Sequence, residues 1–212
     1  MLYNIIMFIL LGLPGSGKSV QSNLFKERKN IYHIAPGIAL RKLAEEGDVQ
    51  LQELLKTGAL VDDKMVAEII QREINQSNEL FIIEGYPRTM EQIVSFKNIL
   101  QDKNKKYLIK KVMVLDISPE IVVHRLTTRK VCGKCHKSFQ NKTLECDSCF
   151  IELTTRSDDN YEAIVNRMRV QGDYLKQILN YFTQENIPVE IINGDQPVEK
   201  VFEDIEKVMD IE

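Results

Sequence analysis

The chain has 212 residues, of which 43% are hydrophobic and 28% are charged, and its formal net charge is -3. This composition is ordinary for a soluble globular protein with one core domain and small insertions. The balance of charge excludes a broad basic field that would attract nucleic acid, so local arginines and lysines must hold any small anionic ligand.

The first eleven residues are largely apolar and are expected to form a buried parallel strand. No Lys or Arg precedes them, no small-residue cleavage site follows them, and eleven residues are too few to cross a bilayer. Because no export signal is recognisable, we expect the protein in the cytoplasm. Its four cysteines would stay reduced there, which favours metal binding over disulfides.

Apolar runs alternate with amphipathic stretches, which predicts an α/β fold with a parallel sheet and right-handed crossovers. The expected strands are Tyr3–Leu11, Ile31–Ile34, Leu80–Glu84, Lys111–Asp116 and Pro188–Ile192. The expected helices are Gly17–Lys29, Ile38–Glu46, Leu51–Lys56, Asp62–Gln76, Met90–Gln101, Pro119–Thr128, Asp158–Gln184 and Val198–Met209. Two stretches break the alternation, the purely helical residues 36–76 and the polar, cysteine-bearing segment from Lys130 to Asp158. Both are expected to be insertions over the carboxyl ends of the strands, where such sheets bind ligands.

The strongest motif is the segment from Gly12 to Ser19, which fits G-x-x-x-x-G-K-[ST] and lies between an expected strand and an expected helix. Its glycines let backbone N–H groups surround phosphates, and the helix N-terminus adds partial positive charge. Lys18 is expected to reach the β- and γ-phosphates of a nucleotide, and the Ser19 hydroxyl to hold Mg²⁺. The alternative is a tight glycine turn without a ligand, which the combined strand, loop, lysine and helix disfavour.

Charged side chains gather near the ends of the expected strands. Glu84 ends the third strand and is a second candidate for the magnesium shell. Six arginines fall in or beside the two insertions and the third and fourth strand ends: Arg41, Arg88, Arg125, Arg129, Arg156 and Arg167. Phosphoryl transfer needs positioning and positive charge around the migrating group, and guanidinium groups supply both. Any one arginine alone is better explained as a solvated surface residue, but six together predict a cluster.

The four cysteines form two pairs, Cys132-x₂-Cys135 and Cys146-x₂-Cys149, separated by ten residues. Two knuckles of this kind make a tetrahedral thiolate site, so we expect a structural zinc ion in the second insertion. Four thiolate ligands leave no open position for catalysis at the metal. The three histidines show no metal-binding pattern and are interpreted as structural: His33, His124 and His136.

Together these residues make the chain resemble the adenylate kinase family over nearly its whole length. The matching stretches are the glycine loop, Gly85-Tyr86-Pro87-Arg88-Thr89 with Gln92, Thr154-Thr155-Arg156-Ser157-Asp158-Asp159, Arg167, and the turn Gly58-Ala59-Leu60-Val61. The resemblance implies a five-stranded parallel P-loop core (residues 1–34, 65–129 and 159–212) flanked by helices. It also implies a helical insertion that binds the nucleoside monophosphate (35–64) and a small zinc-ribbon-like lid (130–158).

The activity that the resemblance implies is reversible transfer of a phosphoryl group from ATP to AMP, giving two ADP. The implied cofactors are Mg²⁺ with ATP and a structural Zn²⁺. The implied partners are ATP and AMP, without nucleic acid or membrane, and the protein is expected to be a monomer.

The resemblance also implies a role for each matching position. The expected ATP-binding residues are Gly15, Ser16, Gly17, Lys18, Ser19, Val20, Arg125, Ser138, Phe139 and Gln196. The expected monophosphate-binding residues are Pro36, Arg41, Ala59, Leu60, Val61, Gly85, Tyr86, Pro87, Arg88, Gln92, Arg156 and Arg167. The expected catalytic residues, around the transferring phosphoryl group, are Lys18, Arg88, Arg129, Arg156 and Arg167. Arg125 would stack on the adenine of ATP, Gln196 would meet that base through its backbone, and Gln92 would read the base of the monophosphate.

Three departures from the family pattern bear on the substrate. Ser19 and Val20 replace the usual Gly-Thr, Glu84 replaces Asp, and Pro36 and Ile38 stand in a stretch that lacks the usual Thr and Asp. Pro36 offers neither a hydroxyl nor an N–H, so a UMP or CMP kinase stays open as an alternative. A further alternative is a non-catalytic zinc- and nucleotide-binding interaction protein, which would require the loss of catalytic residues that are all present.

Overall fold

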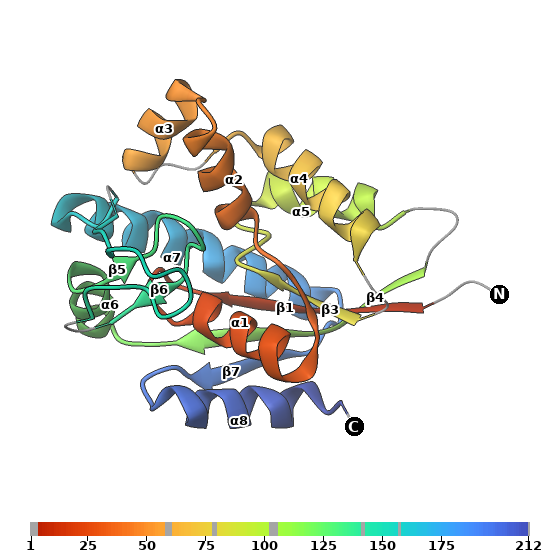
Figure 1. The fold of residues 1–212 in the computed structure, drawn as a ribbon. Helices are drawn as coiled ribbons and strands as arrows, with labels where there is room; N and C mark the ends of the chain where they lie inside the picture. Colours follow the sequence, from red (N-terminus) through yellow and green to blue (C-terminus); the bar gives the residue numbers. More distant parts are fainter. Residues whose placement is uncertain are drawn as a thin grey trace.

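The computed structural model describes residues 4–57, 61–77, 80–101, 106–140, 143–156 and 158–211. Its central sheet contains β1 (Asn4–Gly12), β2 (Tyr32–Ile34), β3 (Leu80–Glu84), β4 (Lys106–Asp116) and β7 (Val189–Asn193), all parallel, in the order β2-β3-β1-β4-β7. The predicted five-stranded parallel sheet is confirmed. After β1 the chain builds one side of the sheet with β2 and β3, and then the other side with β4 and β7 (Figure 1). Ligands bind beyond the strand ends at such a switch point.

Helices cover both faces of the sheet. On one face lie α1 (Lys18–Lys29) and α8 (Val198–Met209), and on the other lie α4 (Asp63–Gln76), α5 (Met90–Ile99) and α7 (Tyr161–Gln184) (Figure 1). Alternate residues of β1 enter the two cores: Phe8 packs with α1 and α8, whereas Met7 packs with the other three helices. Burial on both faces explains why this strand is an almost continuous apolar run. Among the described residues, no helix is both long and apolar enough to span a membrane.

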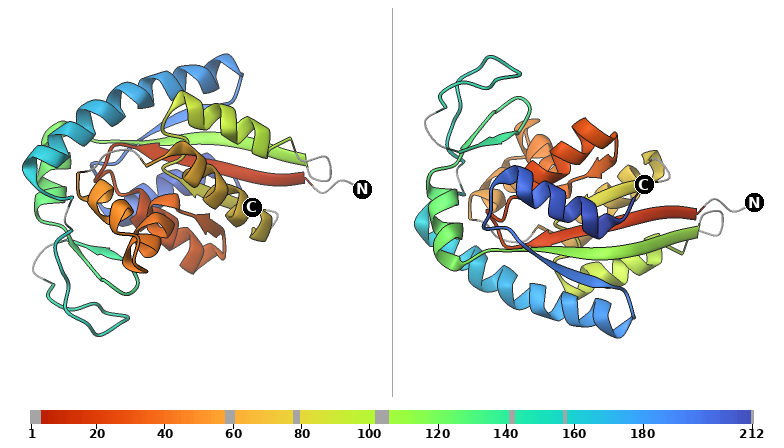
Figure 2. Two further views of the ribbon diagram at one scale, coloured as in Figure 1. Left: turned by 90° about the horizontal axis from the view of Figure 1, so that it is seen from above. Right: turned by 90° about the horizontal axis from the view of Figure 1, so that it is seen from below.

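Two segments rise beyond the carboxyl ends of the strands. The first contains α2 (Pro36–Glu45) and α3 (Val49–Lys56), which follow β2. The second follows α6 (Pro119–Thr127) and contains an antiparallel pair, β5 (Lys130–Val131) and β6 (Ser138–Phe139). Both views in Figure 2 show the second segment, in green to teal, at the end of the molecule opposite the N-terminus and beside α2 and α3.

Several element boundaries differ from those expected from the sequence, and three of the starts have a clear physical reason. β4 begins at Lys106 instead of Lys111, because its lysine-rich first half pairs with β1 although it lacks an apolar pattern. α2 begins at Pro36 instead of Ile38, since proline suits the first position of a helix, where no N–H is needed. α7 begins at Tyr161 instead of Asp158, after Asn160 accepts a hydrogen bond from the Ala163 N–H as the N-cap.

The contact between α1 and α8 predicts a site sensitive to truncation. Phe25 is 1% exposed, and its ring centroid lies 4.4 Å from that of Phe202. Phe25→Ala should destabilise the protein by about 3–5 kcal/mol, because it leaves a cavity between two packed helices. Urea unfolding should show a lower midpoint with an unchanged slope. Val198→Ala, at an exposed position of α8, is the control and should leave the midpoint nearly unchanged; equal effects of the two substitutions would contradict the packing argument.

Candidate active site

The loop between β1 and α1 is shaped to hold phosphate. Gly15 and Gly17 have φ angles of 79° and 98°, in the left-handed region that residues with a Cβ rarely adopt. Lys18 Nζ lies across the loop and donates to the carbonyl oxygens of Gly12 (2.9 Å) and Leu13 (2.8 Å). Because α1 begins at Lys18, the partial positive charge of the helix N-terminus adds to that of the side chain.

Glu84, at the end of β3, lies beside this loop and faces two partners. One carboxylate oxygen accepts a hydrogen bond from the Ser19 hydroxyl, and the other lies 2.7 Å from His33 Nε2 on β2. Burial alone would raise the pKa of Glu84, but His33, Ser19 and Lys18 outweigh it and the pKa falls to about 2. The carboxylate is therefore ionised at neutral pH. Together with the Ser19 hydroxyl it offers the oxygen ligands that Mg²⁺ prefers.

Five of the six predicted arginines line one cavity of about 170 Å³ next to the loop: Arg41, Arg88, Arg129, Arg156 and Arg167. They come from α2, the turn before α5, both ends of the segment predicted to form a lid (130–158) and α7. A Cβ built on Gly37 would lie 3.6 Å from Arg41 and 3.9 Å from Arg88, so these two guanidinium groups meet over a bare stretch of backbone. Lys18 is close as well, since a Cβ on Gly85 would lie 3.1 Å from Arg88 and 3.7 Å from Lys18 Cε.

The positive charges that line the cavity repel one another. Burial lowers the pKa of Lys18 to about 7, and Arg88, Arg167 and Arg129 contribute to the decrease against the opposing effect of Glu84. Burial also lowers the pKa of Arg88 and Arg156, and the neighbouring guanidinium groups lower it further. Such a cluster is stabilised when an anion binds, because the anion offsets both the desolvation and the repulsion.

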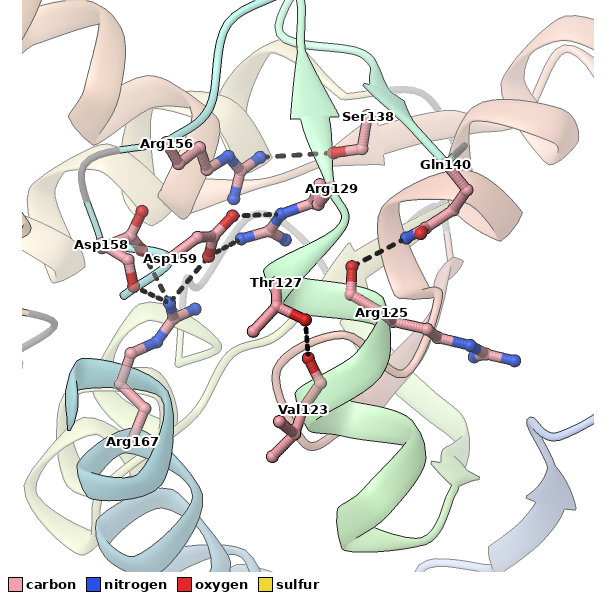
Figure 3. Close-up of polar contacts among 10 residues, drawn as sticks. All are labelled: Val123, Arg125, Thr127, Arg129, Ser138, Gln140, Arg156, Asp158, Asp159 and Arg167. Atoms are coloured by element: carbon pink, nitrogen blue, oxygen red, sulfur yellow. Dashed lines mark hydrogen bonds and ion pairs between the residues drawn. The ribbon is translucent and has the colours of Figure 1, made fainter. Parts of the chain in front are cut away.

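Two of the arginines are fixed by carboxylates. Arg129 donates to both oxygens of Asp159, at 2.8 Å from Nε and 2.6 Å from Nη2, and the Asp159 side chain is completely buried (Figure 3). Arg167 Nη1 lies 2.8 Å from Asp158 Oδ2 and 3.6 Å from Asp159 Oδ1. Arg156 instead donates to the Ser138 hydroxyl at 3.5 Å. These pairs hold Arg129 and Arg167 in place around the cavity.

The three remaining arginines of the cavity have no carboxylate partner within the described residues. No ion pair there involves Arg41, Arg88 or Arg156. The Nε of Arg41 is buried and has no hydrogen-bond partner in this part of the chain. An unpaired buried donor costs free energy, so the side of the cavity formed by α2 is suited to an incoming phosphate.

Most of the other predicted site residues line the same cavity. These are Gly15, Gly17, Ser19, Val20, Pro36, Val61, Glu84, Gly85, Tyr86, Gln92 and Ser138, whereas Pro87 lines a smaller adjoining cavity. Ser16 is buried and accepts a hydrogen bond from Lys18. Ala59 and Leu60 lie outside the described residues.

Three further predicted residues, like Ser16 and Pro87, do not line this cavity. The Arg125 side chain points away from the other arginines (Figure 3) and donates to the carbonyl oxygen of Gly194 at 2.9 Å. The Gln196 side chain donates to the carbonyl oxygen of Asn193 at 2.8 Å, so Arg125 and Gln196 belong to one neighbouring surface. Phe139 packs against the lid cysteines.

Several residues of the site were not predicted from the sequence. His33 was interpreted as structural without a partner, but its contact with Glu84 makes it part of the site. The pairing of Asp158 and Asp159 with particular arginines was not predicted, although both lie in the matching stretch that contains Arg156. Gln171 also lines the cavity, and its place four residues after Arg167 on α7 was the available signal.

The lid cysteines form a compact cluster. The Sγ atoms of Cys132, Cys135, Cys146 and Cys149 all lie within 4.8 Å of one another. Zn–S bonds of about 2.3 Å in a tetrahedron place sulfur atoms about 3.8 Å apart, and those of Cys135 and Cys146 are 3.7 Å apart. Burial raises the pKa of the Cys132 thiol, but backbone N–H groups and neighbouring thiols outweigh it and the pKa falls to about 7. The cluster is therefore compatible with zinc.

A family model described as Adenylate kinase matches residues 10–187, which include the glycine loop, the arginine-lined cavity and the cysteine cluster. The chain belongs to the adenylate kinase family. Adenylate kinases of Bacillus cytotoxicus and Bacillus thuringiensis are each 34% identical to it over 209 residues, a match that covers 93% of this chain and 95% of each relative. The predicted resemblance is confirmed. The departures from the family pattern therefore occur within a member of the family: Ser19, Val20, Glu84, Pro36 and Ile38.

The buried pair of Arg129 and Asp159 predicts a strong effect on stability. Asp159→Asn removes the negative charge that balances Arg129 in a cavity with further cations, and breaking such pairs typically costs about 3–5 kcal/mol. Urea unfolding near neutral pH would measure the loss. Glu199→Gln is the matched control, because it breaks a bidentate pair between Glu199 and Arg28 at the surface. The side chains of Glu199 and Arg28 are 64% and 43% exposed. Water screens that pair, so its loss should change the midpoint little; equal changes in both variants would contradict a special role for burial.

Proposed function

We propose that the protein transfers the γ-phosphoryl group of ATP to AMP, reversibly, and yields two ADP. The observation that carries this proposal is the gathering of Lys18 and five arginines around one cavity at the end of a phosphate-binding loop. In the reaction, a phosphate oxygen of AMP forms a bond to the γ-phosphorus. The bond from that phosphorus to the β–γ bridging oxygen breaks, and the bridging oxygen keeps the electron pair. Charge spreads over the γ-phosphoryl oxygens in the transition state, where fixed cations stabilise it.

The two nucleotides are assigned to opposite sides of the cavity. The glycine loop with Lys18 would hold the phosphates of ATP, and Ser19 with Glu84 would hold Mg²⁺, which neutralises the β- and γ-phosphate oxygens when bound. Arg41 and Arg88, which meet over Gly37, would bind the phosphate of AMP. The remaining cations of the cavity would surround the migrating group: Arg129, Arg156 and Arg167.

The segments 35–64 and 130–158 are proposed to act as the monophosphate-binding domain and the lid. Contacts of the lid with two other elements support this division: His136 lies 3.7 Å from Glu45 on α2, and Lys137 lies 2.9 Å from Glu27 on α1. Closure of both segments would exclude water, which would otherwise accept the phosphoryl group from ATP.

Turnover with a panel of acceptors tests the proposed reaction. With ATP fixed, kcat/KM for AMP should exceed the values for CMP, UMP and GMP, because the Gln92 amide can pair with the adenine edge. Lys18→Ala should abolish most turnover with an unchanged melting temperature. If CMP or UMP equals AMP, the protein is a pyrimidine monophosphate kinase, and if no acceptor reacts, the catalytic proposal fails.

The cysteine cluster is proposed to bind one structural zinc ion per chain. Metal analysis of protein purified without chelator should find about one zinc per chain, and Cys149→Ser should lower this content. Ser148→Ala is the matched control, because Ser148 lies in the same knuckle but contributes no ligand. The absence of zinc and iron from the purified protein, or equal metal loss in both variants, would contradict the site.

A further inference from the structure

The side-chain amide of Gln92 is held at both of its ends. Its Oε1 accepts a hydrogen bond from the Arg88 backbone N–H at 2.7 Å, and its Nε2 donates to Asp63 Oδ1 at 2.8 Å. A backbone N–H can only donate and an ionised carboxylate can only accept. Exchanging the two ends of the amide would therefore place donor against donor and acceptor against acceptor. The chemistry of the partners fixes which way the amide points.

Asp63 is itself held in place. It lies in the first turn of α4, and its second oxygen accepts a hydrogen bond from the Thr89 hydroxyl at 3.2 Å. Thr89 is the N-cap of α5 and accepts from the Gln92 backbone N–H at 3.0 Å. Thr89 and Gln92 are 4% and 2% exposed, so two of the three side chains in this small network are buried, and Asp63 is partly exposed. Gln92 lines the cavity, whereas Asp63 is not among the lining residues and lies behind it.

We propose that Asp63 is a specificity-determining residue, which selects adenine by locking the orientation of the Gln92 amide. This inference rests on the proposed function. A glutamine amide has two donor hydrogens and two acceptor lone pairs. The contacts with Arg88 and Asp63 use one of each, which leaves one donor and one acceptor for a base.

The fixed amide of Gln92 distinguishes adenine from 6-oxopurines by the group at position 6 of the purine. Adenine presents its N6–H donor next to acceptor nitrogens, which complements the free acceptor and donor of the amide. A 6-oxopurine such as hypoxanthine presents the acceptor O6 at that position and pairs with the amide in the opposite orientation. Because Asp63 disfavours that orientation, the site should reject IMP. Asp63 acts through Gln92 and does not need to touch the nucleotide.

Asp63→Asn tests this directly, because an asparagine of the same shape can either accept from Gln92 or donate to it. The ratio of AMP to IMP affinity, measured by calorimetry without turnover, should fall by about tenfold, which is the effect of one good hydrogen bond. The ratio of kcat/KM values for the two acceptors should fall in parallel. Asp62→Asn is the matched control: it removes the same charge one residue away, and asparagine keeps the N-cap bonds to Lys64 and Met65. Its ratios should stay within about twofold of the unmodified protein.

A double-mutant cycle separates a lock on Gln92 from a general structural role. In the Gln92→Ala background, Asp63→Asn should no longer change the AMP-to-IMP ratio. An unchanged ratio in the single variant, an equal change in Asp62→Asn, or an effect that persists without Gln92 would each overturn the inference. If melting shows that Asp63→Asn does not fold, Thr89→Val, which removes the hydroxyl that holds Asp63, should lower the ratio while Thr89→Ser keeps it. Failure of the unmodified protein to phosphorylate any monophosphate would instead refute the proposed function.

Discussion

Repulsion among cations in one partly buried cavity is the constraint around which the site is organised. Lys18 and five arginines converge where the parallel strands end, and partial burial prevents water from screening them fully. The chain offsets part of this charge with its own carboxylates, Glu84 at the end of β3 and the neighbouring pair Asp158 and Asp159. The remaining positive charge can be offset only by anionic ligands. The same set of charges therefore bears on both folding and phosphate binding.

The sheet topology makes this concentration of charge possible. Since β1 lies between β3 and β4, the loop after β1 and the carboxylate after β3 reach the same point from adjacent strands. The remaining cations come from segments between the strands of the sheet. Some of these segments also supply carboxylates that pair with the arginines. Arg129 and Arg167 are braced by the neighbouring carboxylates Asp158 and Asp159, whereas Arg41, on the short helix α2, forms no ion pair among the described residues. The arginines with carboxylate partners thus lie just after α6 and on α7, whereas those without one lie on α2, before α5 and before α7.

How much of the fold and of the site could be predicted depends on whether each feature has a local pattern in the sequence. The glycine loop and the apolar strands β1 and β3 are local patterns, and they were placed correctly. The first half of β4 was missed because lysines interrupt its apolar residues, and only pairing with β1 makes it a strand. Arg125 was grouped with the other five arginines because all six lie in or beside the insertions and strand ends. Because α6 ends at Thr127, however, Arg125 does not share a helix face with Arg129. The partners of the arginines and of His33 depend on contacts between distant segments, which spacing cannot reveal.

The two-residue strand β6 has a consequence for communication within the lid. Successive residues of a strand point to opposite faces. Accordingly, Ser138 and Gln140 line the phosphate cavity, whereas Phe139 between them packs against the cysteine cluster. Three consecutive residues thus connect the cysteine cluster to the arginine-lined cavity through one short piece of backbone. A shift of the sulfur atoms that displaced Phe139 would therefore move the backbone on either side of it, which carries two residues of the cavity wall.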